Sequence, residues 1–259
     1  MSVASLPRLM VAPNGARRTH ADHPALPVTI DETVETAIAC QRVGADGIHA
    51  HVRDSDAKHI LDAGLYKELI SELTIKAPEL HVQITTEAVG MYSPKMQRQL
   101  VYDVQPQRVS VALTEMTADG DAAAAREFYH SCHQAGTGLQ HILYSVDDLK
   151  ALQQLVKDGT VPTDDLQLLF VLGRYSENQQ SRPSDIQPFL DQLKVSGLTA
   201  DWGLCAFGQQ ETDCLVAAES SGGHMRIGFE NSLWHSDGRI AKDNAERISE
   251  LLEALRNKR

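Results

Sequence analysis

Residues 31–52 read DETVETAIACQRVGADGIHAHV, and this stretch contains the unit that is repeated along the chain. Its first part has apolar side chains at the spacing of an amphipathic helix. We expect Asp31 to cap the amino end of that helix and Gly44 to stop it. Residues 47–52, GIHAHV, then form a short apolar run that is typical of a buried strand. The stretch therefore predicts a helix followed by a strand.

The same alternation runs along the whole chain. Short runs rich in apolar and β-branched side chains are predicted strands, at residues 8–13, 47–52, 81–86, 108–113, 138–144, 166–172, 201–206 and 225–230. Longer amphipathic stretches are predicted helices, at residues 31–44, 63–77, 93–103, 121–136, 147–159, 185–197, 211–222 and 244–257. Strands that alternate with helices in this way indicate a parallel sheet of the α/β class.

Eight strand–helix units in 259 residues fit a closed (β/α)8 TIM barrel better than an open doubly wound sheet. An open sheet usually has a glycine-rich phosphate-binding turn after its first strand. The segment at that place, PNGARR (13–18), contains a single glycine. The sequence shows neither a linker nor a low-complexity segment, so we predict one barrel domain over residues 1–259.

The charge of the chain limits its partners. Lys and Arg together number 24 and Asp and Glu together number 35, so the formal net charge is 24 − 35 = −11. This sign opposes general binding to nucleic acids and to anionic membranes, and a phosphate-bearing ligand would need its own local basic residues. We find no apolar run long enough to span a bilayer and no secretion signal, and the four cysteines form no CxxC pair. We therefore expect a cytoplasmic protein with reduced thiols.

The active site of such a barrel lies at the carboxyl ends of the strands. The second predicted strand ends with His49 and His51, whose side chains point to the same side because residues alternate along a strand. The eighth ends with Glu230, and barrel closure brings that strand within reach of the second. Two imidazoles and one carboxylate leave room for water or substrate on a catalytic metal, although histidines bound within the core and an ordinary ion pair are alternatives. Arg226 precedes Glu230 by four residues and is expected on its side of the strand.

Four segments together resemble the β-keto acid cleavage enzymes. They are APNGARRTHADHPALPVT (12–29), GADGIHAHVRD (44–54), FVLG (170–173) and GGHMRIGFEN (222–231), in the same order and at matching strand ends. The resemblance implies a (β/α)8 barrel with a divalent metal, usually zinc, and a homo-oligomer such as a tetramer. It also implies acetyl-CoA as the co-substrate of a β-keto acid, with acetoacetate and a new CoA thioester as products.

Carried over residue by residue, the resemblance makes His49, His51 and Glu230 the metal ligands. Arg226 matches an arginine of the family on the last strand and is expected to support charge or proton transfer. Thr85 matches a serine of the family and is expected to bind substrate.

Three positions depart from the family pattern. Asn231 replaces a common aspartate and is expected to bind substrate, because an amide cannot act as a base. Arg17 replaces an acidic residue and is either a clamp for a substrate carboxylate or an exposed loop arginine. The third position is Glu115, which is our candidate for the missing base. Glu87 is the second candidate, and ordinary surface ion pairs are the alternative for both.

These residues predict a metal-dependent, acetyl-CoA-dependent enzyme that cleaves β-keto acids. Two other hypotheses stay open. One is a metal-dependent lyase, aldolase or hydrolase on the same barrel that does not use CoA. The other is an inactive homologue that binds a metal or a keto acid as a sensor or partner subunit.

Overall fold

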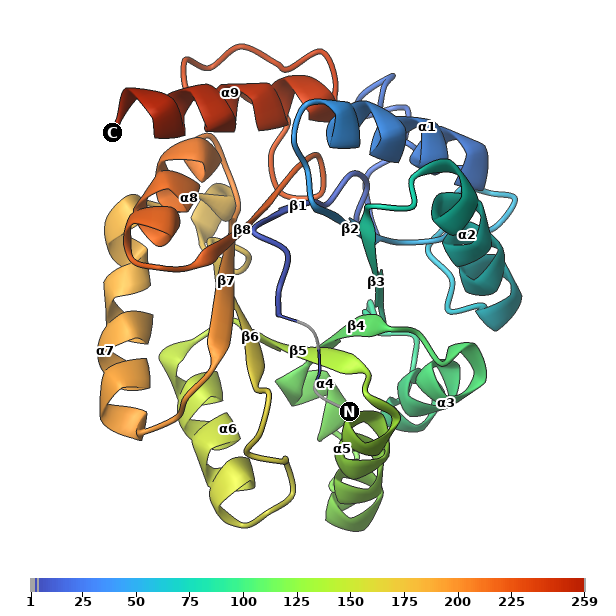
Figure 1. Cartoon of the computed structure of the whole chain (residues 1–259), viewed down its shortest axis with the longest axis vertical. Helices are drawn as coiled ribbons and strands as arrows, with labels where there is room; N and C mark the ends of the chain where they lie inside the picture. Colours follow the sequence, from blue (N-terminus) through green and yellow to red (C-terminus); the bar gives the residue numbers. More distant parts are fainter. Residues whose placement is uncertain (1–2, 4, 259) are drawn as a thin grey trace.

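A computed structural model describes residue 3 and residues 5–258, so the outermost ends of the predicted domain lie outside the described residues. Eight parallel strands form a closed barrel in sequence order, as predicted, and helices surround it (Figure 1). The strands are β1 (Leu9–Val11), β2 (Gly47–Ala50), β3 (His81–Thr85), β4 (Arg108–Ala112), β5 (Gly138–Leu143), β6 (Gln167–Leu172), β7 (Asp201–Ala206) and β8 (His224–Ile227). The barrel closes where Met10 of β1 pairs with Arg226 of β8 on one side and with Gly47 of β2 on the other.

The outer layer contains all the predicted helices. They are α1 (Ile30–Arg42), α2 (Ala63–Lys76), α3 (Pro94–Val104), α5 (Ala122–Ala135), α6 (Val146–Lys157), α7 (Gln187–Ser196), α8 (Glu211–Ser220) and α9 (Asn244–Asn257). The structure adds three short elements that the sequence analysis did not predict: α4 (Leu113–Met116), η1 (Glu177–Gln179) and η2 (Pro183–Ile186). In the part of the chain that is described, no helix is long and apolar enough to cross a membrane.

The ends of α1 show how local sequence sets these boundaries. Thr29, not Asp31, is the N-cap: its side chain accepts a hydrogen bond from the amide of Glu32, whose own carboxylate accepts one from the amide of Thr29. This reciprocal capping box satisfies two free amides, so Asp31 falls in the first turn, where its negative charge favours the helix dipole. Gly44 follows the helix with a φ of +113°, as expected of a stop signal.

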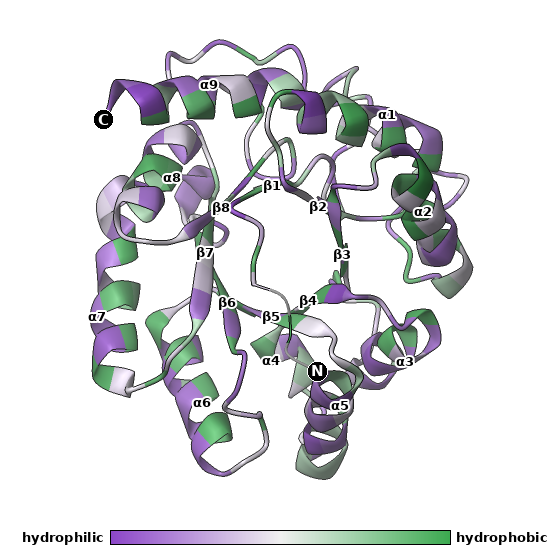
Figure 2. Cartoon of the chain, viewed as in Figure 1, coloured by the Kyte–Doolittle hydropathy of each residue, from purple (hydrophilic) through white to green (hydrophobic). Residues whose placement is uncertain are grey.

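The core lies mainly between the strands and the helices. Figure 2 shows that the outer helices carry hydrophobic and hydrophilic residues side by side, and the buried ones pack against the outer faces of the strands. A smaller apolar cluster, which includes Ile142, Val171 and Phe207, lies inside the barrel. The segment before β1 runs across the ring in Figure 1, and the amide of Leu6 bonds to the side chain of Asp201 at the start of β7. The amino end of the barrel is thereby covered, which leaves the carboxyl end for ligands.

Two of the strands that end earlier than predicted carry site residues just beyond their ends. β2 ends at Ala50 and β8 at Ile227, so His51 and Glu230 lie just beyond them. Gly228 has a φ of +146°, and a Cβ at this position would lie 2.4 Å from the carbonyl oxygen of Ala12. The chain therefore turns sharply at this glycine, and Glu230 reaches the barrel mouth from a turn instead of from the strand.

Candidate active site

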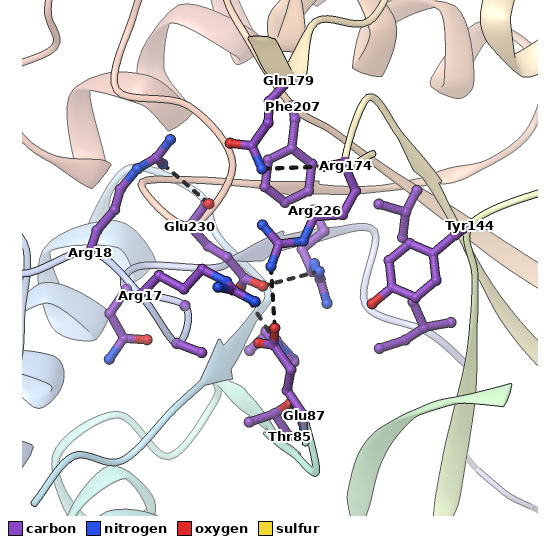
Figure 3. A pocket seen from close by; sticks show the side chains of 16 residues that line it. Arg17, Arg18, Thr85, Glu87, Tyr144, Arg174, Gln179, Phe207, Arg226 and Glu230 are labelled. Carbon is purple, nitrogen blue, oxygen red and sulfur yellow. Dashed lines mark hydrogen bonds and ion pairs between the residues drawn. The ribbon is translucent and has the colours of Figure 1, made fainter. Parts of the chain in front are cut away.

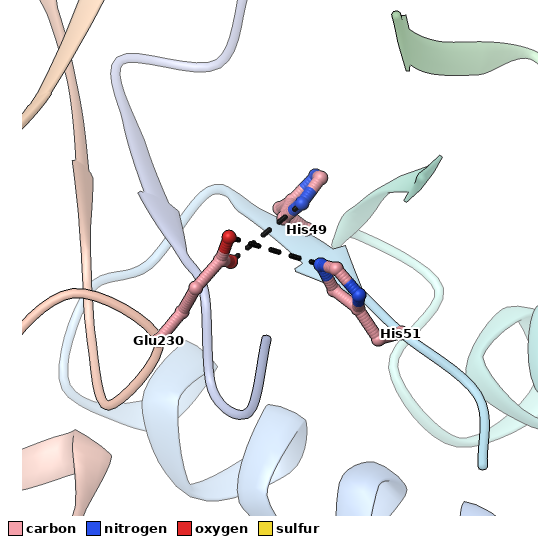
Figure 4. Close-up of side chains that lie close together, drawn as sticks. All are labelled: His49, His51 and Glu230. Atoms are coloured by element: carbon pink, nitrogen blue, oxygen red, sulfur yellow. Dashed lines mark ion pairs between the residues drawn. The ribbon is translucent and has the colours of Figure 1, made fainter. Parts of the chain in front are cut away.

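Three side chains converge at the carboxyl end of the barrel, as the sequence predicted. His49 Nε2 lies 3.6 Å from Glu230 Oε2, and His51 Nε2 lies 3.7 Å from Glu230 Oε1 (Figure 4). One ligand atom from each of the three residues lies within 4.8 Å of the others. Both imidazoles are almost completely buried and the carboxylate is 13% exposed. The three residues form one compact set of two nitrogen donors and one oxygen donor.

This set fits a divalent cation. Both ring nitrogens of His51 and the Oε2 atom of Glu230 are buried without a hydrogen-bond partner among the described residues, which is costly unless another ligand satisfies them. Two ligand atoms about 2.1 Å from one tetrahedral ion are about 3.4 Å apart, close to the separations found here. Two imidazoles and a carboxylate also leave a coordination position open for substrate.

The charges of the three groups suit the same role. Burial, together with Arg226, lowers the pKa of His49 well below its usual value, which favours the neutral imidazole that binds metals. Burial works against ionisation of Glu230, but Arg226 and the two histidines outweigh it and hold the pKa of this carboxyl well below its usual range. The site thus presents a neutral His49 imidazole and an ionised Glu230 carboxylate near neutral pH.

A chain of hydrogen bonds through the barrel fixes which nitrogen of His49 faces the site. Gln140 Nε2 donates to the carbonyl oxygen of Leu168, so its Oε1 accepts from Gln83 Nε2 at 3.0 Å. The Oε1 atom of Gln83 is then the acceptor for His49 Nδ1 at 2.8 Å. His49 therefore carries its proton on Nδ1, and the lone pair of Nε2, on the side of Glu230, would be free to bind a cation.

Backbone anchors hold the other two ligands. The side chain of Asn14 donates to the carbonyl oxygen of His51 at 2.9 Å and accepts from its amide at 3.3 Å. Gly15 has a φ of +60°, and a Cβ there would lie 2.6 Å from Cγ of Glu230. The single glycine of PNGARR therefore allows the first loop to pack directly against the carboxylate ligand.

A buried network holds the turn that carries Glu230. Glu211 Oε1 accepts from the amide of Gly228 at 3.2 Å and from Asn231 Nδ2 at 3.1 Å. Its second oxygen pairs with Arg247 Nη2 of α9 at 2.8 Å, and both charged side chains are fully buried. Burial raises the pKa of Glu211, and Arg247 opposes this effect. The structure thus turns Asn231 toward Glu211, away from the substrate-binding place that we expected for it.

The three ligands lie beside a cavity of about 180 Å³ at the mouth of the barrel (Figure 3). Loops after several strands supply its walls. It is lined by Asn14, Gly15, Ala16, Arg17, Arg18, His49, Thr85, Glu87, Ile142, Tyr144, Val171, Arg174, Gln179, Phe207, Arg226 and Glu230. Of the predicted substrate-binding residues, Arg17 and Thr85 line this cavity, whereas Asn231 does not.

Arg226 lines the cavity close to Glu230, and the sequence predicted these two side chains on one side. Its Nη2 atom is 3.5 Å from Glu230 Oε1 and 3.4 Å from the sulfur of Cys205. Its Nε and Nη1 atoms are buried without a partner among the described residues. Burial raises the pKa of Cys205 to about 11, so the sulfur is a neutral thiol. Arg226 thus keeps free N–H donors beside the metal-binding set, and these suit a carboxylate ligand.

The two candidate bases have different surroundings. Glu87 lines the cavity, with Oε2 3.9 Å from His51 Nδ1 and Oε1 3.4 Å from Arg174 Nη2. Glu115 is not among the lining residues: its Oε2 accepts from the amide of Ala88 at 3.0 Å and from Gln97 Nε2 at 2.7 Å. Glu115 therefore supports the loop after β3. Of our two candidate bases, Glu87 is the one that lines the cavity.

Several site residues were missed by the sequence analysis. Gln83 and Gln140 stand at inward positions of β3 and β5, and a glutamine within an apolar barrel strand is a signal that could have been used. Arg174 lies in the loop after β6, where the sequence offers no periodic pattern. Glu211 begins α8 and resembles an ordinary first-turn acid, so its burial could not be foreseen.

Comparisons with known proteins agree with this architecture. A model of the beta-keto acid cleavage enzyme family matches residues 8–258. The 3-keto-5-aminohexanoate cleavage enzyme of Fusobacterium nucleatum is 24% identical over 245 residues, covering 92% of this chain and 87% of that protein. The 3-oxoadipate:acetyl-CoA acetyltransferase of Cupriavidus necator is 25% identical over 264 residues, covering 94% of this chain and 86% of that protein.

Among solved structures, the ternary complex of ObcA with a C4-CoA adduct and oxalate matches with a TM-score of 0.71 and 15% identity. The match covers 91% of this chain but 64% of that one, so this chain spans less than two thirds of ObcA. A type I 3-dehydroquinate dehydratase from Clostridium difficile matches with a TM-score of 0.64 and 10% identity over 99% of this chain and 95% of that one. At these identities the likeness concerns the barrel fold alone.

Proposed function

The chain belongs to the beta-keto acid cleavage enzyme family, and on that premise we propose that it transfers the acetate unit of a β-keto acid onto the acetyl group of acetyl-CoA. The products are acetoacetate and the CoA thioester of the remaining acyl group. The observation that carries the proposal is the buried set of His49, His51 and Glu230 beside the free N–H donors of Arg226. Together they suit a ligand with a carboxylate and a neighbouring keto oxygen.

His49, His51 and Glu230 would hold the divalent cation, for which we propose zinc. When bound, such an ion supplies Lewis acidity toward the keto and carboxylate oxygens of the substrate. Arg226 lines the cavity beside Glu230, and its positive charge would stabilise negative charge that develops on a substrate there. Thr85 lies at the same wall, where its hydroxyl accepts from the amide of Glu87 and orients that residue.

We propose Glu87 as the base. It accepts a proton from C2 of the keto acid, and the C2 carbanion attacks the thioester carbonyl of acetyl-CoA with release of the CoA thiolate. The thiolate adds to the original keto carbon, the bond between that carbon and C2 breaks, and the proton on Glu87 returns to C2 of acetoacetate. Atoms and charge balance without an oxidant or a reductant. Arg174 and His51 lie beside Glu87 and fix the position of its two oxygens.

The test is acetoacetate formation, followed by mass spectrometry, from β-keto acids with acetyl-CoA and zinc. We expect Glu87→Gln to abolish turnover, while the control Glu115→Gln, a carboxylate outside the cavity, retains most of it. His51→Ala should lose both bound zinc, measured by metal analysis, and activity. Full activity of Glu87→Gln would refute its role, and a product that forms without acetyl-CoA would favour the lyase, aldolase or hydrolase alternative.

A homo-oligomeric state, with a tetramer as the specific case, is a further part of this proposal that rests on the family resemblance, and a cytoplasmic location is one that rests on the sequence features given above. The structure describes a single chain. Sedimentation velocity of the purified protein measures the assembly directly, and a monomer at micromolar concentration would contradict it.

A further inference from the structure

The arginines of the cavity outnumber its acids. Arg17, Arg18, Arg174 and Arg226 line it, against Glu87 and Glu230. The names of two relatives contain substrates of opposite side-chain charge. 3-Keto-5-aminohexanoate has an amino group, whereas 3-oxoadipate has a second carboxylate. The charges of this cavity therefore bear on which kind of keto acid the chain accepts.

Both acids of the cavity already face cations. Glu230 lies 3.5 Å from Arg226, and Glu87 lies 3.4 Å from Arg174. A substrate with a cationic side chain would compete with these arginines for the same carboxylates and would also face their repulsion. The cavity thus offers no free acidic partner for an amine among its lining residues.

Two of the arginines, Arg17 and Arg18, form no ion pair with a residue that the structure describes. Arg18 donates to the carbonyl oxygens of Phe229 and Glu230, which are neutral acceptors. Arg17 forms no ion pair with any residue that the structure describes, and Figure 3 shows Arg17 and Arg174 reaching into the cavity from different loops. The guanidinium carbon of Arg174 lies 5.2 Å from the centroid of the Phe207 ring, which holds the group in place.

We propose that the keto acid of this chain ends in a second anionic group, such as a carboxylate, which Arg17 and Arg174 bind. This inference rests on the proposed function and names the substrate class for the same site. In this proposal Arg226, His49, His51 and Glu230 bind the β-keto acid end of the substrate. The apolar side chains of Ile142 and Val171 line the same cavity. A planar guanidinium suits a terminal carboxylate because it binds two oxygens at once.

The experiment compares three six-carbon 3-oxo acids whose far ends carry a carboxylate, a methyl group or an amine, with acetyl-CoA and the zinc-loaded protein. We expect the highest kcat/KM for the dicarboxylate and no turnover of the amine. Arg17→Gln and Arg174→Gln should each lower the ratio of kcat/KM between the dicarboxylate and the methyl compound about 10- to 150-fold, the equivalent of one charged hydrogen bond at 1.5–3 kcal/mol. Arg42→Gln, at an exposed position of α1, is the control and should leave this ratio unchanged.

The phosphates of CoA are a second source of negative charge. Calorimetric titration of the dicarboxylate in the absence of CoA, and of CoA in the absence of keto acid, separates the two sources. Weaker binding of CoA alone in the arginine variants, with unchanged binding of the dicarboxylate, would overturn the inference. Equal turnover of all three acids would also overturn it while leaving the proposed function intact. If no acid yields acetoacetate, the proposed function fails, and the titration of the dicarboxylate still decides the inference.

Discussion

The buried pair of Arg247 and Glu211 is the basis for the most quantitative prediction. Both side chains are fully buried, 2.8 Å apart, and Glu211 also binds the turn that carries Glu230. The variant Arg247→Met keeps the length and apolar stem of the side chain but removes the positive charge. Glu211 would then be left in the core with only the amide of Gly228 and the side chain of Asn231 as partners.

Two estimates of the cost agree. Breaking a buried ion pair by removing one partner costs about 3–5 kcal/mol. The variant can relieve this cost by keeping Glu211 protonated, which at pH 7 costs about 1.36 kcal/mol for each pH unit above the ordinary glutamate pKa of about 4.3, or about 3.7 kcal/mol. We therefore expect Arg247→Met to lower the free energy of unfolding by about 3–4 kcal/mol at pH 7.

The second estimate also fixes the pH dependence. In the variant the pKa of Glu211 is raised in the folded state, so its destabilising effect is absent below the unfolded pKa and grows as the pH rises above it. Between pH 7 and 5.5 the difference from the parent should shrink by about 2 kcal/mol. Urea unfolding at the two pH values measures this change. Arg256→Met, at an exposed position of the same helix, is the control and should cost less than about 0.5 kcal/mol.

A second substitution separates charge from packing. Gln in place of Glu211 keeps an acceptor for Gly228 and Asn231 but carries no charge, so the double variant Arg247→Met/Glu211→Gln should be more stable at pH 7 than Arg247→Met alone. A cost that does not change with pH, or a double variant no more stable than the single one, would refute the account of a buried unpaired carboxylate.

Three further predictions concern the metal-binding set and the core. Gln83→Met should weaken zinc binding about 10- to 100-fold, because His49 loses the acceptor that fixes its tautomer; unchanged affinity by competition titration would contradict this role. Gly15→Ala should lower both stability and zinc affinity, since the new Cβ collides with Glu230, and a crystal structure with an unmoved Glu230 would argue against it. Burial lowers the pKa of His141 to about 4, so the protein should lose up to about 3 kcal/mol of stability as the pH falls from 6.5 to 4, and His141→Leu should remove this loss in acid urea titrations.

The barrel was predictable because its signal repeats. Each strand is a short apolar run and each helix an amphipathic one, so an error at one boundary leaves the order of elements unchanged. The predicted element boundaries were wrong where a side-chain cap or a turn sets the end of an element. Thr29 is the N-cap in place of Asp31 because Glu32 completes a capping box with it. Strand β8 ends earlier than predicted because Gly228 adopts a conformation that other residues rarely adopt.

That His49, His51 and Glu230 lie together was predictable because strand order in a closed barrel brings the ends of β2 and β8 near each other. The base was not. Glu115 was chosen by its place after β4, but the short helix α4 turns its carboxylate toward Gln97 and the amide of Ala88. Asn231 lies next to a ligand in sequence, yet a buried acid from α8, far along the chain, sets its direction. The orientations of Glu115 and Asn231 depend on contacts between segments that are distant in the sequence, and a local sequence pattern cannot predict such contacts.

The hydrogen-bond chain from Leu168 to His49 has a consequence for how this scaffold can diverge. The orientation of His49 depends on glutamines within the sheet, whereas Arg17 and Arg174 extend from the loops after β1 and β6. Substitutions at these two arginines would therefore change the charge of the cavity while leaving the hydrogen-bond chain to His49 intact. Reaction chemistry and substrate choice are in this way separable traits, which allows one lineage to acquire new substrates while it retains one inherited centre.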